Sequence, residues 1–434
     1  MKVSTYNTIL PINSRHTVIF NSLHHSILII KNHILNPSTN LLSLWSDSNS
    51  ELYYQLIDGK FLIEEDNDEV HFLQKSILQA TSNKDEFILH INPTLDCNLN
   101  CWYCYENHIK GSRIFKDTEE SIKKLISHII KTGEIKTLNI GFFGGEPLFH
   151  FFDCTSRIIQ FAYNLTEIHG IELKIHFTSN GTLLNDKIIK FLSAYDCDFQ
   201  ITLDGGRSHH NKTRFLENGH HTFDRIIGNI HKLATNHIPV IVRVNYTQEN
   251  VNSINEIYDV FASFDHAIQE FVRFDFQRVW QQRTNEVDKT ENTISSIREK
   301  FRKNVYMVLI NYLHTNATDV CYGDKKNYLM INYNGEIYGC TARDFISSNR
   351  LGVLENDGKI TYDPGKYEIW ESLKFKKKIC HTCRIAPICG GGCRQRGFDE
   401  PDENICTLHY SEDDKNRMVM DLVDYILANN YYNH

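Results

Sequence analysis

From residue 86 onward, the chain alternates between short apolar stretches and stretches with helical periodicity. Helical spacing is clearest at Ile122, Leu125, Ile126, Ile129 and Ile130. Residues 117–120 resemble a capping box at the start of that helix. Six strands alternating with helices predict an α/β fold with a parallel sheet, either a partial barrel of the TIM type or an open sheet. The expected strands are residues 87–91, 138–142, 173–177, 197–203, 240–245 and 271–276.

The flanking segments have different patterns. Residues 1–84 contain a β-hairpin pattern at 17–20 and 26–30 and predict a small α+β unit. The βα array is expected over 85–313 and ends in a long amphipathic helix near 293–313. A segment rich in cysteine and glycine, with a short strand at 328–332, is expected to form a separate domain over 314–412. The C-terminal helix, 413–434, is predicted to bury Met418, Leu422, Tyr425 and Ile426.

Composition is that of an ordinary globular chain of two or three domains. The 434 residues are 41% hydrophobic and 23% charged, with a formal net charge of −8. That balance gives no basis for sequence-independent binding of nucleic acid. No run of about 18 apolar residues predicts a membrane span, and the N-terminus does not resemble a secretory signal. We therefore expect a cytoplasmic protein with no membrane partner.

Ten of the 12 cysteines fall within residues 97–104 and 321–406. In a cytoplasmic chain, clustered thiols favour metal binding over disulfides. Cys97, Cys101 and Cys104 have a C-x3-C-x2-C spacing, and thiolates at this density commonly hold iron–sulfur clusters. Three cysteines without a nearby fourth ligand make a poor structural zinc site. Three thiolates on a 4Fe–4S cluster would leave one iron open to bind a small molecule.

Polar and glycine-containing motifs follow the predicted strands. Because the carboxyl ends of parallel strands meet at one edge of a sheet, these motifs are expected to share one site. The glycines would let the backbone approach a ligand where no side chain fits. The residues concerned are Gly144, Gly145, Glu146, Pro147, Ser179, Asn180, Asp204 and Arg243.

The cysteine motif, with the aromatic Tyr103 before its last cysteine, resembles the radical SAM superfamily, and so does the 144–147 turn. The resemblance spans roughly residues 86–280. It implies that Cys97, Cys101 and Cys104 hold a 4Fe–4S cluster whose fourth iron binds S-adenosylmethionine. Reduction of that cluster then yields methionine and a 5′-deoxyadenosyl radical, which removes a hydrogen atom from a substrate carbon. A flavodoxin or ferredoxin-type electron donor is implied.

The same resemblance assigns S-adenosylmethionine contacts to the strand-end residues. Gly144, Gly145 and Pro147 would form the turn beside the ligand's amino group, and Glu146 would fix that turn and supply negative charge. Ser179 and Asn180 would face the ribose or the carboxylate. Arg243 would pair with the carboxylate, and Asp204 would be a further polar contact. The alternative is that residues 144–147 form a plain β-turn and that Ser179, Asn180, Asp204 and Arg243 are ordinary polar residues in loops.

The second cysteine set resembles the SPASM domain of radical SAM enzymes that modify peptides and proteins. That resemblance implies two auxiliary clusters, for three 4Fe–4S clusters in all. One would be held fully by Cys380, Cys383, Cys389 and Cys406. The other would be held by Cys321, Cys340 and Cys393, one ligand short, so that it has an open iron or a non-cysteine ligand. Cys154 and Cys197 have the pattern of core residues.

The substrate class is inferred from the residues that follow Cys340. Sulfatase-maturing enzymes share this architecture and have an acidic residue after the cysteine that corresponds to Cys340, where this chain has Thr341. The sequence looks more like a maturase of ribosomally made precursor peptides that forms a thioether or carbon–carbon crosslink. Asp344 is the candidate base, or it pairs with Arg343. Residues 1–84 would bind a leader peptide or only pack. A peptide epimerase, a protein-modifying enzyme and a non-catalytic iron–sulfur carrier remain alternatives.

Overall fold

The computed structural model describes residues 1–34, 41, 50–279, 281, 289–303, 307–308, 318–373, 375 and 377–431. The chain forms two compact units, which are described separately. The larger unit consists of Lys84–Asn311 and Asn327–Tyr367. The smaller unit consists of Met1–Asn83, Tyr312–Lys326 and Glu368–His434.

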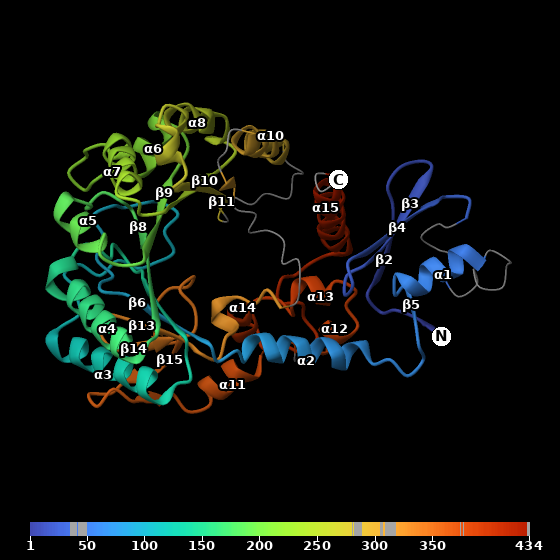
Figure 1. Ribbon diagram of the computed structural model, residues 1–434, viewed down its shortest axis with the longest axis horizontal. Coiled ribbons are helices and arrows are strands. Elements are labelled where there is room, and N and C mark those ends of the chain that lie inside the picture. The colour runs from blue at the N-terminus through green and yellow to red at the C-terminus, as the bar shows by residue number, and fades with distance from the viewer. Residues whose placement is uncertain are drawn as a thin grey trace. The chain divides into compact units, whose positions relative to one another are not determined.

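The larger unit is built on a parallel sheet whose strands follow one another in chain order. Each strand pairs in parallel with the next, and all six predicted strands are confirmed. Because every crossover advances in the same direction, the helices fall on one face of the sheet, as in a barrel (Figure 1). The sheet stays open, with β12 (Met307–Val308) at one edge and β13 (Tyr328–Ile331) beside β6, so the barrel is partial. The six strands are β6 (Glu86–Ile91), β7 (Thr137–Phe142), β8 (Glu172–Ser179), β9 (Cys197–Leu203), β10 (Val240–Tyr246) and β11 (Val272–Arg278).

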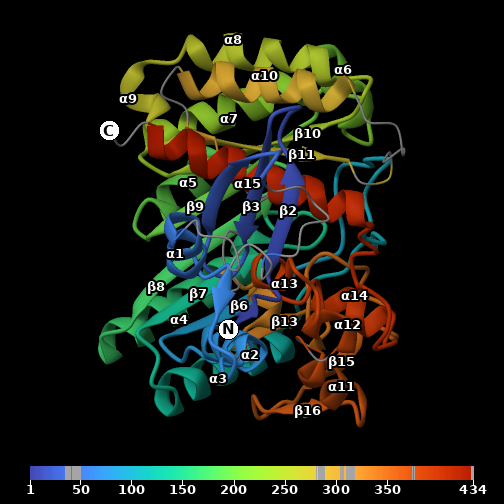
Figure 2. The same ribbon diagram turned by 90° about the vertical axis from the view of Figure 1, so that its right-hand side faces the viewer.

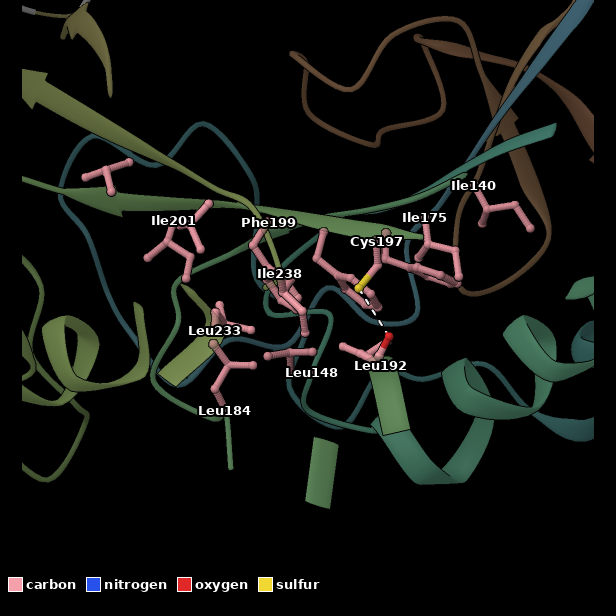
Figure 3. Close-up of a cluster of buried hydrophobic side chains, with 14 of the residues drawn as sticks. Ile140, Leu148, Ile175, Leu184, Leu192, Cys197, Phe199, Ile201, Leu233 and Ile238 are labelled. Atoms are coloured by element: carbon pink, nitrogen blue, oxygen red, sulfur yellow. Dashed lines mark hydrogen bonds between the residues drawn. The ribbon is translucent and has the colours of Figure 1, made fainter. Parts of the chain in front are cut away.

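Helices cover the outer face of this sheet. Alternate strand residues such as Ile140, Ile175 and Phe199 pack against Leu192 and Leu233 (Figure 3). Fully burying each such side chain stabilises the fold by roughly 1.5–3 kcal/mol. The helices are α3 (Lys116–Thr132), α4 (Ser156–His169), α5 (Asp186–Leu192), α6 (Arg207–Thr213), α7 (Phe223–Thr235), α8 (Ile254–Ala262), α9 (His266–Gln269) and α10 (Lys289–Lys303), with short turns η2 (Phe151–Thr155) and η3 (Val251–Ser253).

Two local predictions for this unit are wrong. The expected capping box does not form, because α3 begins at Lys116, after Phe115, and has no side-chain cap. The helix expected to reach residue 313 ends at Lys303, and Met307–Val308 instead pair in parallel with β11. The remaining positions of that expectation, 304–306 and 309–313, lie outside the described residues. The expectation that Cys154 and Cys197 are core residues is confirmed, and the Cys197 thiol donates to the Leu192 carbonyl at 3.5 Å (Figure 3).

The same sheet continues past β13 into antiparallel strands. These are β14 (Glu336–Tyr338), β15 (Arg350–Leu354) and β16 (Ile360–Tyr362). Cys340, which follows β14, therefore belongs to the larger unit. The cysteine-rich segment 314–412 is divided between the two units, because β13 pairs with β6 and so joins residues 327–367 to the larger unit.

The smaller unit combines the two ends of the chain, which Figure 2 shows from a second side. Val18 and Phe20 share a hydrophobic core with Ile388, Val419 and Val423, so the N-terminal sheet packs on the C-terminal helix. The predicted hairpin is confirmed as β3 and β4. The elements are β1 (Lys2–Val3), β2 (Asn7–Pro11), β3 (His16–Asn21), β4 (Ser26–Lys31), α1 (Ser50–Asp58), β5 (Leu62–Ile63), α2 (Glu69–Thr81), η5 (Tyr322–Asp324), α12 (Lys378–His381), α13 (Ala386–Cys389), α14 (Arg394–Asp399) and α15 (Glu412–Tyr431), and α11 (Lys366–Ser372) spans the boundary between the units.

Helix α15 confirms the predicted C-terminal helix, but the residues that it buries differ in part from those predicted. Leu422 is buried as expected, whereas Tyr425 is exposed and that part of the prediction is wrong. Val419 and Val423, one turn apart, occupy the core instead. Among the described residues, every helix is too short or too polar to traverse a bilayer.

Candidate active site

The loop that follows β6 carries Cys97, Cys101 and Cys104. Cys97 is buried, and its sulfur accepts from the Leu99 N–H at 3.4 Å and the Asn180 side-chain amide at 3.7 Å. Cys104 is exposed, and its sulfur lies 3.6 Å from Nε2 of His108. All 12 cysteines lie among the described residues and none is part of a disulfide, so the sulfurs expected to bind clusters are available for ligation.

The thiols of this loop lie in surroundings that disfavour an isolated negative charge. Burial, with the Glu146 charge adding to it, raises the pKa of Cys97 to about 12, and burial also raises the pKa of the partly buried Cys101. A thiolate there needs a cation beside it, which is what iron ligation supplies. Within the described ranges, no three His, Cys, Asp or Glu side chains converge on a single ion. The cysteines of a 4Fe–4S cluster ligate separate irons, so the donor set fits a cluster better than a lone ion.

The turn after β7 lies directly against the backbone that leads into the cysteine loop. The Gly145 N–H donates to the Thr94 carbonyl at 3.0 Å and the Glu146 N–H donates to the Asp96 carbonyl at 2.9 Å. A Cβ at Gly144, whose φ is +100°, or at Gly145 would lie within 3.0 Å of these same carbonyl oxygens. The space left by the two glycines is therefore occupied by the approach to the cysteine loop.

Glu146 joins the ends of two strands. Its side chain is fully buried and accepts hydrogen bonds from the Ser179 hydroxyl at 2.8 Å, the Asn180 N–H at 2.7 Å and the Leu148 N–H at 3.1 Å. Burial raises the pKa of Glu146, and these donors oppose that shift. The carboxylate therefore holds the turn after β7 against the end of β8, which agrees with the expectation that it fixes the turn.

Asn180 holds the other side of the cysteine loop. Its side-chain amide donates to Oδ1 of Asn98 at 2.9 Å, and Asn98 donates in turn to the Thr182 hydroxyl at 2.9 Å. The Thr182 hydroxyl donates back to Oδ1 of Asn180 at 2.6 Å, which closes a ring of side chains. Asn180, predicted to contact a ligand, bonds in the structure to Cys97 and Asn98, whereas the Ser179 hydroxyl donates to Glu146.

Tyr103, between the second and third cysteines, is the centre of a buried polar network. Its hydroxyl donates to the Asp204 carboxylate at 2.7–2.8 Å. It accepts from Nη1 of Arg214 at 2.8 Å and from the Asn245 amide at 3.1 Å. Arg243 joins the network through Asn245, whose Oδ1 accepts from its Nε at 3.1 Å. The network therefore connects the cysteine loop to the ends of β9 and β10.

Arg214 and Asn245 were missed in the sequence. Arg214 comes directly after α6 and Asn245 is the sixth residue of β10, and neither belongs to a recognisable motif spacing. Both side chains are buried. Nε of Arg214 is buried without a hydrogen-bond partner, so it is a donor available to an anionic group. That orphan donor, in the same network as Tyr103, fits the carboxylate of an amino-acid ligand.

The segment after Cys340 is tied to the chain that follows Cys104. Both oxygens of Asp344 accept from Asn107, Oδ1 from its N–H at 3.2 Å and Oδ2 from its side-chain amide. The Tyr105 hydroxyl donates to the Thr341 carbonyl at 3.1 Å. Asp344 is thus a positioning group for the cysteine loop as the structure stands.

The other cysteines of the second set lie in the smaller unit, apart from Cys340. Cys389 and Cys393 flank three glycines at 390–392, all with positive φ. A Cβ at Gly392 would lie within 3.0 Å of the Thr407 side chain, so this turn requires glycine and lies against the residue that follows Cys406. The remaining members of this set are Cys321, Cys380, Cys383 and Cys406.

Comparisons with known proteins agree with this geometry. Residues 91–261 match the model of the radical SAM superfamily. A cysteine-type anaerobic sulfatase-maturating enzyme of Clostridium perfringens (strain 13 / Type A) is 22% identical over 350 residues, which cover 72% of this chain and 90% of that protein. An uncharacterized protein of Methanocaldococcus jannaschii is 26% identical over 279 residues, which cover 63% of this chain and 90% of that protein.

Two solved structures share the fold. The structure titled native anSMEcpe with bound AdoMet and Cp18Cys peptide has a TM-score of 0.60 at 19% identity, covering 80% of this chain and 99% of that one. Streptococcus suis SuiB bound to its precursor peptide SuiA has a TM-score of 0.53 at 15% identity, covering 93% of this chain and 97% of that one. This chain therefore contains a radical SAM domain and is a homologue of the anaerobic sulfatase-maturating enzymes.

Proposed function

We propose that this protein is a radical SAM maturase that removes a hydrogen atom from a ribosomally made precursor peptide. The proposal rests on the hydrogen bonds of the cysteine loop. Its side chains bond to residues at the ends of β8, β9 and β10, and Nε of Arg214 in the same network is buried without a hydrogen-bond partner. An open-iron cluster and an amino-acid carboxylate are the two groups that such a site suits. The matched relatives and solved structures support the same chemistry.

Cys97, Cys101 and Cys104 would hold the 4Fe–4S cluster. Once bound and reduced, the cluster supplies the electron that converts S-adenosylmethionine into methionine and a 5′-deoxyadenosyl radical. Arg214 is the donor we assign to the methionyl carboxylate, since its Nε has no protein partner, whereas Nε of Arg243 already donates to Asn245. The buried carboxylate of Glu146 would place negative charge near the ammonium group of S-adenosylmethionine. Residues 144–147 would lie beside the amino group of the ligand, Ser179 and Asn180 would face its ribose or carboxylate, and Asp204 would be a further polar contact.

The second cysteine set would hold two auxiliary 4Fe–4S clusters with the ligand assignment given above. All seven cysteines lie among the described residues and none is part of a disulfide, as ligation requires. A flavodoxin or ferredoxin would supply electrons. The glycine turn 390–392 between Cys389 and Cys393 has the tight backbone that close thiolate spacing needs.

A precursor peptide is the substrate that we favour over a sulfatase. Thr341, buried, stands where a sulfatase-maturing enzyme has its acidic residue, and its carbonyl accepts from Tyr105. Residues 1–84 supply a three-stranded antiparallel sheet with helices, a suitable platform for a leader peptide. The proposed product is an intrapeptide thioether or carbon–carbon crosslink, with epimerisation as the second candidate. Asp344 as a base would first have to release Asn107.

The radical-generating step is tested with purified protein whose clusters have been reconstituted anaerobically. S-adenosylmethionine and dithionite are added, and 5′-deoxyadenosine is measured by liquid chromatography. The wild type is expected to form it, and the triple variant Cys97→Ala, Cys101→Ala, Cys104→Ala is expected to form none. The matched control is Cys154→Ala with Cys197→Ala, two buried thiols outside the loop, which should retain activity and iron content. Formation of 5′-deoxyadenosine by the triple variant would overturn the proposal, and its absence from the wild type would favour an iron–sulfur carrier.

The substrate is tested by co-expressing small peptides encoded beside this gene and weighing the products. Crosslinking removes two hydrogens, whereas epimerisation leaves the mass unchanged and is detected by chiral amino-acid analysis. An unmodified peptide from every co-expression, together with formation of 5′-deoxyadenosine, would contradict the peptide assignment and leave radical generation intact.

A further inference from the structure

The face of the large sheet that the helices leave uncovered carries polar side chains. On β8, Ile175 and Phe177 enter the helix-facing core, while the alternate residues His176 and Thr178 lie on the opposite face and are only partly buried. Barrel interiors of this class are ordinarily filled by branched apolar side chains. Within the larger unit, the strands lie inside an arc of helices (Figure 1). A polar inner face is suited to contact a polar substrate.

One histidine on this face is held in a definite orientation. His176 and Asp198 are direct neighbours in the register of β8 and β9. Nδ1 of His176 lies 2.9 Å and 3.0 Å from the two carboxylate oxygens of Asp198, and Nε2 lies 3.2 Å from the Thr178 hydroxyl. Because a carboxylate can only accept there, Nδ1 carries the proton and Nε2 presents its lone pair. The two side chains are 35% and 38% exposed, so the pair is accessible.

A second histidine in the same row cannot play the same part. The register runs from His90 through Gly141 to His176, and the missing side chain of Gly141 leaves room for the His90 ring. His90 is partly buried, and its Nδ1 lies 3.2 Å from the Tyr328 hydroxyl. Burial, with the charge on His176 adding to it, lowers the pKa of His90 to about 3. The imidazole of His90 therefore stays neutral near neutral pH and adds no charge beside His176.

Other charged groups that face His176 are few. Along its own strand, Lys174 pairs with Glu172 at 3.2 Å and is 49% exposed. From β9 the facing charge is Asp198, and from β6, across Gly141, it is the neutral His90. The favourable partner of a proton on His176 is thus Asp198.

We propose that His176 is the proton acceptor of the product-forming step and that Asp198 is its positioning residue. This rests on the proposed function. The substrate carbon first loses a hydrogen atom to the 5′-deoxyadenosyl radical. Formation of the new bond would then release one proton, which Nε2 of His176 would take as the Thr178 hydroxyl rotates away from it, and one electron, for which an auxiliary iron–sulfur cluster would be the oxidant. His176 lies three residues before the strand end at Ser179, about 10 Å along the strand, within the span of a bound peptide.

The first test separates radical generation from product formation. His176→Gln and Asp198→Asn are compared with Lys174→Gln, a same-face control on the same strand. His176→Gln is expected to retain 5′-deoxyadenosine formation and to lose product by about 100-fold, the scale of general acid–base catalysis. Asp198→Asn should lose product less severely, and Lys174→Gln should change neither yield. Wild-type product yield in His176→Gln would overturn the proposal, as would product loss in Asp344→Asn with His176→Gln unaffected.

The second test does not depend on activity. The tautomer of His176 is read from nitrogen-15 shifts in selectively labelled protein without clusters, with the signal assigned by its loss in His176→Gln. The expected neutral form carries its proton on Nδ1 and loses that preference in Asp198→Asn; a wild type protonated on Nε2 would overturn the proposal. A wild type that forms no 5′-deoxyadenosine but has the expected tautomer would refute the proposed function and leave the oriented His176–Asp198 pair in place.

Discussion

Replacing Tyr103 by phenylalanine should loosen the cysteine loop while the rest of the barrel stays folded. The change removes one hydroxyl and keeps the ring. That hydroxyl donates to the Asp204 carboxylate and accepts from Arg214 and Asn245. Asp204 and Arg214 are buried, so water does not readily replace the lost partner.

The magnitude follows from the charges on two of these partners. Hydrogen bonds to charged groups contribute about 1.5–3 kcal/mol each, and neutral ones about 1 kcal/mol. The three bonds share one oxygen, and Arg214 can shift toward Asp204, so the losses do not add fully. We expect about 2–4 kcal/mol, a change of roughly 30- to 1,000-fold in the open fraction of the loop.

Hydrogen exchange of the protein without clusters measures that fraction directly. Peptides that cover residues 97–104 should exchange 30- to 1,000-fold faster in Tyr103→Phe, with peptides from α4 and α7 unchanged. Trp102→Phe is the matched control, since Trp102 is the adjacent residue, is 54% exposed and contacts Tyr103 only edge-to-face. Equal exchange in the two variants would refute the reasoning, and so would acceleration spread evenly over the whole larger unit.

Two further predictions concern stability. Gly145→Ala should destabilise the folded protein by about 1–3 kcal/mol, because the new Cβ would meet the Asp96 backbone oxygen. Gly228→Ala, in α7 with open space around it, should stabilise the folded protein by about 0.5–1 kcal/mol. Thermal unfolding compares the two variants, and a Gly145→Ala protein as stable as the wild type would contradict the packing described. His90 has a pKa of about 3, below its unfolded value of 6.5, so the unfolded chain takes up a proton that the folded chain refuses, and stability falls as the pH drops below 6.5. Between pH 7.5 and 5.0 this loss is about 2 kcal/mol, and denaturant unfolding of His90→Gln should show an acid loss smaller by that amount; an identical loss in both proteins would refute it.

The larger unit shows which parts of the fold can be predicted from local pattern. All six strands of the parallel sheet were predicted within a few residues, because their apolar residues must alternate to reach the helix-facing core. The placement of residues 327–367 was not predictable in this way. Strand β13 pairs with β6, and the partner of a strand far along the chain is decided by tertiary packing rather than by its own sequence.

The residues of the candidate site also divide into those that the sequence predicts and those that only the fold reveals. The cysteines, the glycine turn and Glu146 are set off by spacing and by strand ends, so they were found. Arg214 was not found, because an arginine after a short helix looks like any solvated arginine until the fold buries it. The roles of Ser179 and Asn180 were also beyond the sequence. A polar residue at a strand end can point to a ligand or to a neighbouring loop, and only the geometry distinguishes the two.

The ends of the strands help to order the cysteine loop through bonds between protein groups. The cysteine loop contains almost no regular structure, yet Asn98 and Tyr103 are each bonded to side chains from strand ends, and Lys110 donates to the Cys97 carbonyl at 2.9 Å. These bonds join protein groups to protein groups, so the sheet itself contributes to the ordering of the loop. The entropy that cluster ligation must overcome is reduced accordingly, unlike in small metal domains, where binding free energy is the folding free energy. A substitution such as Asn98→Ala should therefore weaken cluster retention although it leaves every cysteine in place.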